Sequence, residues 1–323
     1  MELTEPQLCF PMLLNTSCRR QPARASYGMD VLSILLFFMA VVTAFLNLLV
    51  IISISHFRQL HSSTNSFLLS LAVSDFLIGM VVVPIEVQMT STCWYLGDLL
   101  CALYFIVPIT LIMASVGTMV LISVDRYVAI CDPLRYQTRI TIKVVNLSIC
   151  LCWTCAVIYS VCLLHENLEH PGRFNSCFGE CVVNINGEVD LVVGCILPVS
   201  VVIVLYTRVF KVVLSQVRAM RCQVSLPSAT GNAKMSEVKA ATSLGVVVLA
   251  FLFCYIPYYL VTMSGGHILI GSLIESYTIF IVYFNSCLNP VIYALFCRWF
   301  RTALKLIVTL QILKPGSCHA RLL

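Results

Sequence analysis

Seven apolar runs, each about as long as a lipid bilayer is thick, constrain this chain more than any other feature. A hydrocarbon core of about 30 Å needs roughly 20 apolar residues in a helix, and a backbone in lipid must satisfy its own hydrogen bonds. With 59% hydrophobic and 11% charged residues, the composition excludes a soluble fold. We expect seven membrane-spanning helices, at residues 29–55, 65–87, 98–130, 143–165, 187–218, 235–263 and 271–296.

Short connections between these runs leave room for one domain. The expected fold class is an all-α membrane protein with a seven-transmembrane helix bundle at residues 29–296. An N-terminal tail precedes it at 1–28, and a short amphipathic eighth helix with a cytoplasmic tail follows at 297–323. An Asn15-Thr16-Ser17 sequon in the first segment predicts glycosylation of Asn15 and therefore an extracellular N-terminus.

The distribution of charge agrees with this orientation. Most of the 20 Lys and Arg fall in or beside the segments that an outside N-terminus makes cytoplasmic. The net charge of +5 is therefore a sign of topology and not of nucleic-acid binding. We expect a multi-pass plasma-membrane protein in contact with lipid. The cysteines expected on the oxidising outer side are Cys9, Cys18, Cys93, Cys101, Cys177 and Cys181.

A polar cluster is expected inside the bundle, where ionisable groups are costly and usually functional. Asp75 in the second helix and Ser115 in the third could supply oxygen ligands that suit a hard cation such as sodium. The alternative is a structural hydrogen-bond network around a water molecule. No other cofactor is expected. The members from the seventh helix are Asn285, Ser286 and Asn289.

The inner end of the third helix carries the triplet Asp125-Arg126-Tyr127. Arg126 can pair with Asp125 or, across the bundle, with Glu237 at the start of the sixth helix. Such a clasp would be bistable and could hold the cytoplasmic face closed. The alternative is that the basic side chain only reaches from the membrane toward water.

Ordered motifs along nearly the whole chain are similar to those of the rhodopsin-like G-protein-coupled receptors. The resemblance implies a receptor and not an enzyme, with an activation switch at its inner end. The motifs are Asn47, Leu71, Ala72, Asp75, Cys101, Asp125-Arg126-Tyr127, Trp153, Pro198, Tyr206, Phe251, Cys254-Tyr255-Ile256-Pro257 and Asn289-Pro290-Val291-Ile292-Tyr293. The implied switch residues are Asp125, Arg126, Tyr127, Tyr206, Glu237, Asn289, Pro290 and Tyr293.

Two further segments resemble the trace amine-associated receptors: the stretch NSCLNPVIYALFCRWF at residues 285–300 and the outer-loop pair Cys177 and Cys181. In that family one loop cysteine joins the third helix and the other joins the N-terminal tail. The resemblance implies a Cys101–Cys181 disulfide and a second bond from Cys177 to either Cys9 or Cys18. It also implies reception of small amines, mostly in olfactory neurons, and coupling to a stimulatory heterotrimeric G protein that raises cyclic AMP.

The acid that amine receptors usually place in the third helix is missing. Seven residues after Cys101, where the family pattern has Asp, this chain has Pro108. We expect Asp190 in the fifth helix to hold the ammonium instead, a pattern that resembles some fish trace amine receptors. Alternatively, Asp190 only complements the helix dipole. The alternative function is a receptor of the same fold for a non-amine ligand.

A second acid and a group of tyrosines complete the expected ligand site. Glu86 in the second helix would let the site bind a diamine, or it is a solvated helix end. The tyrosines could surround an ammonium through cation–π and hydroxyl contacts, although aromatic residues at helical spacing also pack a core. The remaining expected contacts are Pro108, Ile109, Ile112, Tyr255, Tyr258, Tyr259 and Tyr283.

Overall fold

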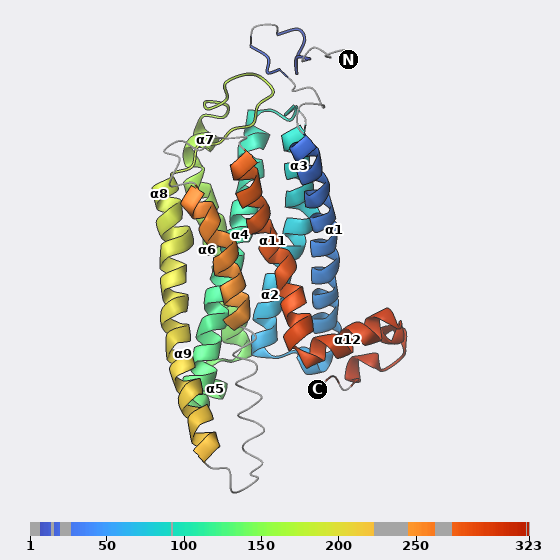
Figure 1. Ribbon diagram of the computed structural model, residues 1–323, viewed down its shortest axis with the longest axis vertical. Coiled ribbons are helices and arrows are strands. Elements are labelled where there is room, and N and C mark those ends of the chain that lie inside the picture. Colours follow the sequence, from blue (N-terminus) through green and yellow to red (C-terminus); the bar gives the residue numbers. More distant parts are fainter. Residues whose placement is uncertain are drawn as a thin grey trace.

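The computed structural model describes residues 7–13, 16–19, 27–91, 93–222, 245–261, 273–320 and 322. Side chains at 27–30, 32, 89–91, 216–222 and 273–277 are outside this description. Helical rods run side by side in one bundle (Figure 1). We call the end that carries α7 and α8 the outer end, and the end that carries α5 and α12 the inner end.

Four of the rods are single helices, and two are interrupted by a π-helical segment. The single ones are α1 (Tyr27–His56), α4 (Asp98–Cys131), α6 (Ile142–Leu163) and α11 (Leu273–Phe296). The second rod consists of α2 (Ser63–Leu77), the π-helical η2 (Ile78–Val82) and α3 (Val83–Ser91). The fifth consists of α8 (Gly187–Asp190), the π-helical η3 (Leu191–Ile196) and α9 (Leu197–Cys222).

The sixth rod is the helix Gly245–Val261, which carries no label in Figure 1. The start expected for it at residue 235 lies outside the described residues. Short helices connect or follow the rods: η1 (Arg58–Leu60), α5 (Pro133–Arg139), α7 (His165–Glu169), α12 (Arg298–Val308), η4 (Gln311–Leu313) and η5 (Ser317–His319).

The sides of the rods that face away from the centre of the bundle are apolar. Six rods are long and apolar enough to cross a membrane, and Gly245–Val261 is a shorter apolar helix. Large side chains such as Phe37 and Phe38 of α1 are more than half exposed. Such a belt is stable against hydrocarbon and not against water. The prediction of a multi-pass helical membrane protein is therefore confirmed.

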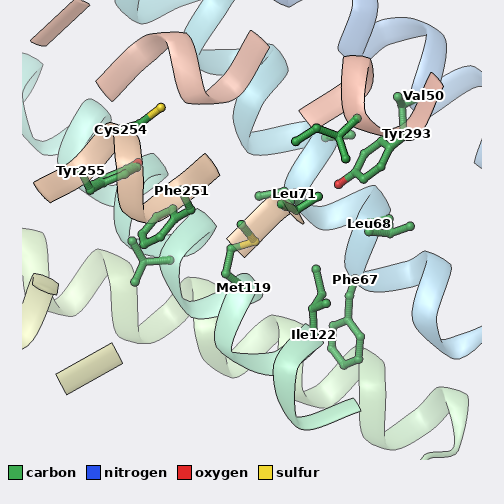
Figure 2. Close-up of a cluster of buried hydrophobic side chains, with 14 of the residues drawn as sticks. Val50, Phe67, Leu68, Leu71, Met119, Ile122, Phe251, Cys254, Tyr255 and Tyr293 are labelled. Carbon is green, nitrogen blue, oxygen red and sulfur yellow. The ribbon is translucent and has the colours of Figure 1, made fainter. Parts of the chain in front are cut away.

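The core lies where α2, α4, the sixth helix and α11 meet (Figure 2). The rings of Phe251 and Tyr255 stack with centroids 4.2 Å apart on one side of this cluster. Tyr293 of α11 lies on the other side, near Leu71 (Figure 2). Polar contacts also join the rods: the Asn47 amide donates to the Ser286 carbonyl at 3.0 Å. Such bonds hold helices together where lipid provides no hydrophobic drive.

The helix α12 leaves the inner end of the bundle sideways (Figure 1). Its Phe300 and Ala303 are fully buried, and Ala303 packs in one cluster with Phe57 and Leu60 from the turn after α1. Leu322 from the end of the chain completes this cluster. This arrangement is the amphipathic eighth helix that the sequence predicts.

Candidate functional site

Asp190 lies near the outer end of the fifth rod, at a junction of three helices. Its Oδ1 accepts a hydrogen bond from the Tyr159 hydroxyl of α6 at 2.9 Å, and the carboxylate also accepts one from the Tyr259 hydroxyl of the sixth helix. The acid is partly buried. Among the described residues, no basic side chain forms an ion pair with it.

The π-helical segment η3 sets the direction of Asp190. An α-helical turn takes 3.6 residues, and a π turn takes about one residue more. Asp190 lies eight residues before the buried Pro198, which corresponds to two turns when one of them is π-helical. Asp190 and Pro198 therefore lie on the same face of the rod, and this face points into the bundle.

Glu86 has a similar place in the second rod, just beyond η2. Its Oε2 accepts a hydrogen bond from the Tyr104 hydroxyl of α4 at 3.1 Å, and Tyr283 of α11 interacts electrostatically with both residues. Glu86 is partly buried. Within the described ranges it too has no ion-pair partner.

The third helix contributes no acid at this level. Pro108 is buried inside α4, and Ile109 and Ile112 are half-buried. Ile112 packs against the core cluster. Thr110, two residues further toward the inner end than Pro108, donates to the Ser160 hydroxyl at 2.9 Å.

The four expected tyrosines divide into two groups. Tyr255 is 5% exposed and stacks on Phe251, so it packs mainly in the core. Tyr258 and Tyr259 meet edge to face with ring centroids 5.2 Å apart, and Tyr259 reaches Asp190. Tyr283 is buried close to Glu86 and Tyr258. These last three therefore extend between the two acids.

A small apolar cavity of ≈ 10 Å³ lies below this level, between α4, α9 and the sixth helix. Pro198, Phe251 and Met119 are among the residues that line it. The volume is about that of one water molecule. This cavity is therefore too small to be the site of an organic ligand.

Two residues of the predicted polar cluster, Ser286 and Asn289, meet Asp75 in the middle of the bundle. Asp75 is fully buried, and its Oδ2 accepts a hydrogen bond from the Asn289 amide at 2.8 Å. Ser286 also bonds to Asp75, and Ser115 bonds to Ser74 at 2.8 Å. Of the seven buried side-chain oxygens without a hydrogen-bond partner in the described part of the chain, three belong to the predicted cluster: Oδ1 of Asp75, Asn285 and Asn289. Unpaired buried oxygens beside an acid fit a cation.

Asp125 at the inner end of α4 binds three side chains. It pairs with Arg126, accepts a hydrogen bond from the Thr64 hydroxyl at 2.9 Å, and accepts another from the Tyr136 hydroxyl of α5 at 2.8 Å. Burial raises the pKa of the Tyr136 phenol, so it stays a donor at physiological pH. The local ion pair between Asp125 and Arg126 is therefore formed. The expected partner across the bundle, Glu237, lies outside the described residues.

The other expected switch residues lie along the same inner half of the bundle. Tyr206 of α9 is 6% exposed and packs beside Phe210. Pro290 is inside α11, and Tyr293 is 2% exposed. Tyr127 is half-buried against the cluster of Ile130, Val209 and Val213.

Three disulfides close the outer end. Cys101 joins Cys181, as the resemblance implies, and Cys177 joins Cys18 rather than Cys9. Cys9 forms a third bond with Cys93. The sequence placed Cys93 on the oxidising side but gave no sign of its partner. Asn15, the expected glycosylation site, lies outside the described residues.

Backbone contacts hold the tail against the outer loops. The Cys18 amide donates to the Phe178 carbonyl at 2.9 Å, and the Phe178 amide donates to the Thr16 carbonyl at 2.7 Å. Gly179 has φ +101°, and a Cβ on it would lie 2.8 Å from the Cys9 Cβ. A residue without a side chain is therefore needed where the tail crosses the loop.

The comparisons with known proteins agree with this architecture. The family described as 7 transmembrane receptor (rhodopsin family) matches residues 46–293. Similar proteins include "Trace amine-associated receptor 13c" from Danio rerio, 36% identical over 99% of this chain and 97% of the relative. Two more are "Trace amine-associated receptor 8c" from Rattus norvegicus (35%; 96% and 95%) and "Trace amine-associated receptor 6" from Homo sapiens (35%; 99% and 96%).

A seven-helix membrane bundle with this family match defines a receptor of the rhodopsin class and not an enzyme. Within that class, the chain belongs to the trace amine-associated receptors. Membership implies a small-molecule ligand and a G-protein partner.

Proposed function

We propose that this chain is a plasma-membrane receptor for small amine odorants. In this proposal the outer end is extracellular, and the receptor signals through a stimulatory G protein of the olfactory class that raises cyclic AMP. The observation that carries the proposal is Asp190, a partly buried carboxylate without a cationic partner among the described residues. An uncompensated acid in a low-dielectric site is costly, and an ammonium ligand would compensate it.

The tyrosines around Asp190 support the same ligand class. A protonated amine could donate a charge-assisted hydrogen bond to the carboxylate, which accepts up to about four bonds and uses only some of them for Tyr159 and Tyr259. The faces of Tyr258 and Tyr259 offer cation–π contacts. Pro108, Ile109 and Ile112 would form the apolar floor on the third-helix side.

Glu86 extends the proposal to diamines. Like Asp190, it is a partly buried acid without an ion-pair partner in the part of the chain that the structure describes. Tyr258 and Tyr283 lie between the two acids. A ligand with two separated ammonium groups could neutralise both carboxylates. A monoamine would neutralise Asp190 alone.

The test uses cells with a cyclic-AMP reporter and a panel of linear monoamines and diamines of matched length. We expect Asp190→Ala to lower the potency of all active amines by about 100-fold or more, because it removes one partner of a buried ion pair. Glu86→Gln should lower the potency of diamines only. Glu188→Ala is the matched control, because Glu188 is an exposed acid in the same turn as Asp190.

Unchanged amine potency in Asp190→Ala would contradict the proposed site. If the wild-type receptor reaches the cell surface and answers no amine, the ligand belongs to another class. Pro108, in place of the usual third-helix acid, favours that second candidate.

We also propose that the polar cluster binds a sodium ion. Oδ1 of Asp75 and the side-chain oxygens of Asn285, Asn289, Ser115 and Ser286 are the expected ligands, because hard cations prefer oxygen. The ion would compensate the fully buried charge of Asp75.

A further inference from the structure

Gly194 lies four residues after Asp190, within the π-helical η3, and is buried. A Cβ on Gly194 would lie 2.6 Å from the Tyr259 hydroxyl oxygen and 3.2 Å from Asp190 Oδ1. Real Cβ atoms essentially never approach a heavy atom within 3.0 Å. A side chain at position 194 would therefore displace the Tyr259 hydroxyl, and it would also press more weakly on Asp190 Oδ1.

This hydroxyl comes from a different helix. Tyr259 belongs to the sixth rod, is 8% exposed, and has its ring fixed edge to face against Tyr258. A buried hydroxyl without a partner is costly, and Asp190 supplies the acceptor. The Tyr259 hydroxyl packs directly against Gly194 at the point where it bonds to the carboxylate.

We propose that Gly194 is a positioning residue of the amine site: its missing side chain admits the Tyr259 hydroxyl to Asp190 and so ties the sixth helix to the ligand-binding acid. The inference rests on the proposed function, because it takes Asp190 as the ammonium acceptor. Binding of an ammonium group to the Asp190 carboxylate then changes the hydrogen bond that the Tyr259 hydroxyl donates.

The same helix carries the connection toward the core. Tyr255, one turn below Tyr259, stacks on Phe251, and both belong to the cluster that joins the sixth helix to α4 and α11 (Figure 2). The Asp190–Tyr259 contact therefore links the ligand level to the core through one helix face.

The test is a double-mutant cycle on Gly194 and Tyr259, read as amine potency at equal surface expression. Tyr259→Phe removes one hydrogen bond to the carboxylate and should lower potency roughly threefold. Gly194→Ala leaves the hydroxyl in place and forces the ring away from Asp190, so it should lower potency about tenfold or more. Gly245→Ala is the matched control, because the nearest atom to its added Cβ is 3.5 Å away, an ordinary contact.

The double variant decides the question. Without the hydroxyl, the nearest atom of residue 259 is the ring carbon that now lies 3.7 Å from the Cβ position. Tyr259→Phe should therefore rescue most of the potency lost in Gly194→Ala, because only the weaker 3.2 Å approach to Asp190 Oδ1 remains. Potency losses that multiply in the double variant, or an unaffected Gly194→Ala receptor, would overturn the proposal.

A second readout separates this proposal from the amine proposal. The melting temperature of the purified receptor without ligand should fall in Gly194→Ala and recover in the double variant. If Asp190→Ala leaves amine potency unchanged while this pattern holds, the amine site is wrong and the packing of Tyr259 on Gly194 stands. If amines act through Asp190 but neither readout shows rescue, the role of Gly194 is wrong.

Discussion

Asp75, Asp125 and Asp190 are three acids of one bundle, and each is held differently. Asp125 pairs with a guanidinium, Asp190 accepts hydrogen bonds from tyrosine hydroxyls, and Asp75 accepts them from Asn289 and Ser286. Only the first has a positive partner among the described residues. A bound cation is therefore stabilised most at Asp75 and Asp190, where it compensates a charge that has no positive partner.

We expect sodium chloride to raise the melting temperature of the purified receptor above its value in choline chloride at the same ionic strength. An ion that binds only the folded state stabilises it by mass action, and equal ionic strength removes general screening. Asp75→Asn should abolish the difference. Asp98→Asn, which alters an acid at the outer end, should keep it. A sodium effect that survives Asp75→Asn would show that the cluster is only a hydrogen-bond network.

At the scale of elements, α12 depends on one aromatic side chain outside it. Phe57, between α1 and η1, is fully buried in the cluster that contains Ala303 of α12. We expect Phe57→Ala to lower the free energy of unfolding by about 3 kcal/mol or more, because it leaves a cavity. Thermal melting in detergent measures this. Phe38→Ala should have little effect, because Phe38 is 67% exposed on the lipid-facing side of α1; equal losses would contradict the assignment.

The helices themselves were predictable, and their interruptions were not. The lengths of the apolar runs were enough to locate every rod that the structure describes, since a helix must be long enough to cross the lipid bilayer. The π-helical η2 and η3 leave no trace in composition, because Ile78–Val82 and Leu191–Ile196 are as apolar as an α-helix would be. The importance of Gly194 was missed for the same reason: it depends on where η3 directs the residue and on Tyr259 from another helix.

At the scale of the whole molecule, the Cys9–Cys93 bond ties the tail to the end of the second rod. We expect the double variant Cys9→Ser/Cys93→Ser to lose about 2–4 kcal/mol of stability, because the bond restricts the unfolded chain. Melting of the purified receptor checks this. Cys150→Ser/Cys155→Ser is the matched control, because both thiols are free and exposed on α6. An unchanged melting temperature in the first variant would mean that the tail adds no stability.

The disulfide pairings at the outer end could be predicted only in part from the sequence. The resemblance gave Cys101–Cys181, because that pairing joins two motifs at fixed places in the chain. The choice of Cys18 for Cys177, and of Cys93 for Cys9, depends on how the tail crosses Gly179. No local pattern encodes that crossing. The same holds for Asp190, whose two hydroxyl partners come from helices distant in sequence.

The three disulfides also impose an order on biosynthesis. Cys18 leaves the ribosome 159 residues before its partner Cys177. At about 5–20 residues per second, Cys18 must wait roughly 8–30 s for its partner while four helices enter the membrane. Cys9 waits only for Cys93, which follows it by 84 residues. The tail can therefore be fixed before the fifth, sixth and seventh helices, which carry Asp190, Tyr259 and Tyr283, have been synthesised. The outer cover of the ligand site thus precedes part of the site itself.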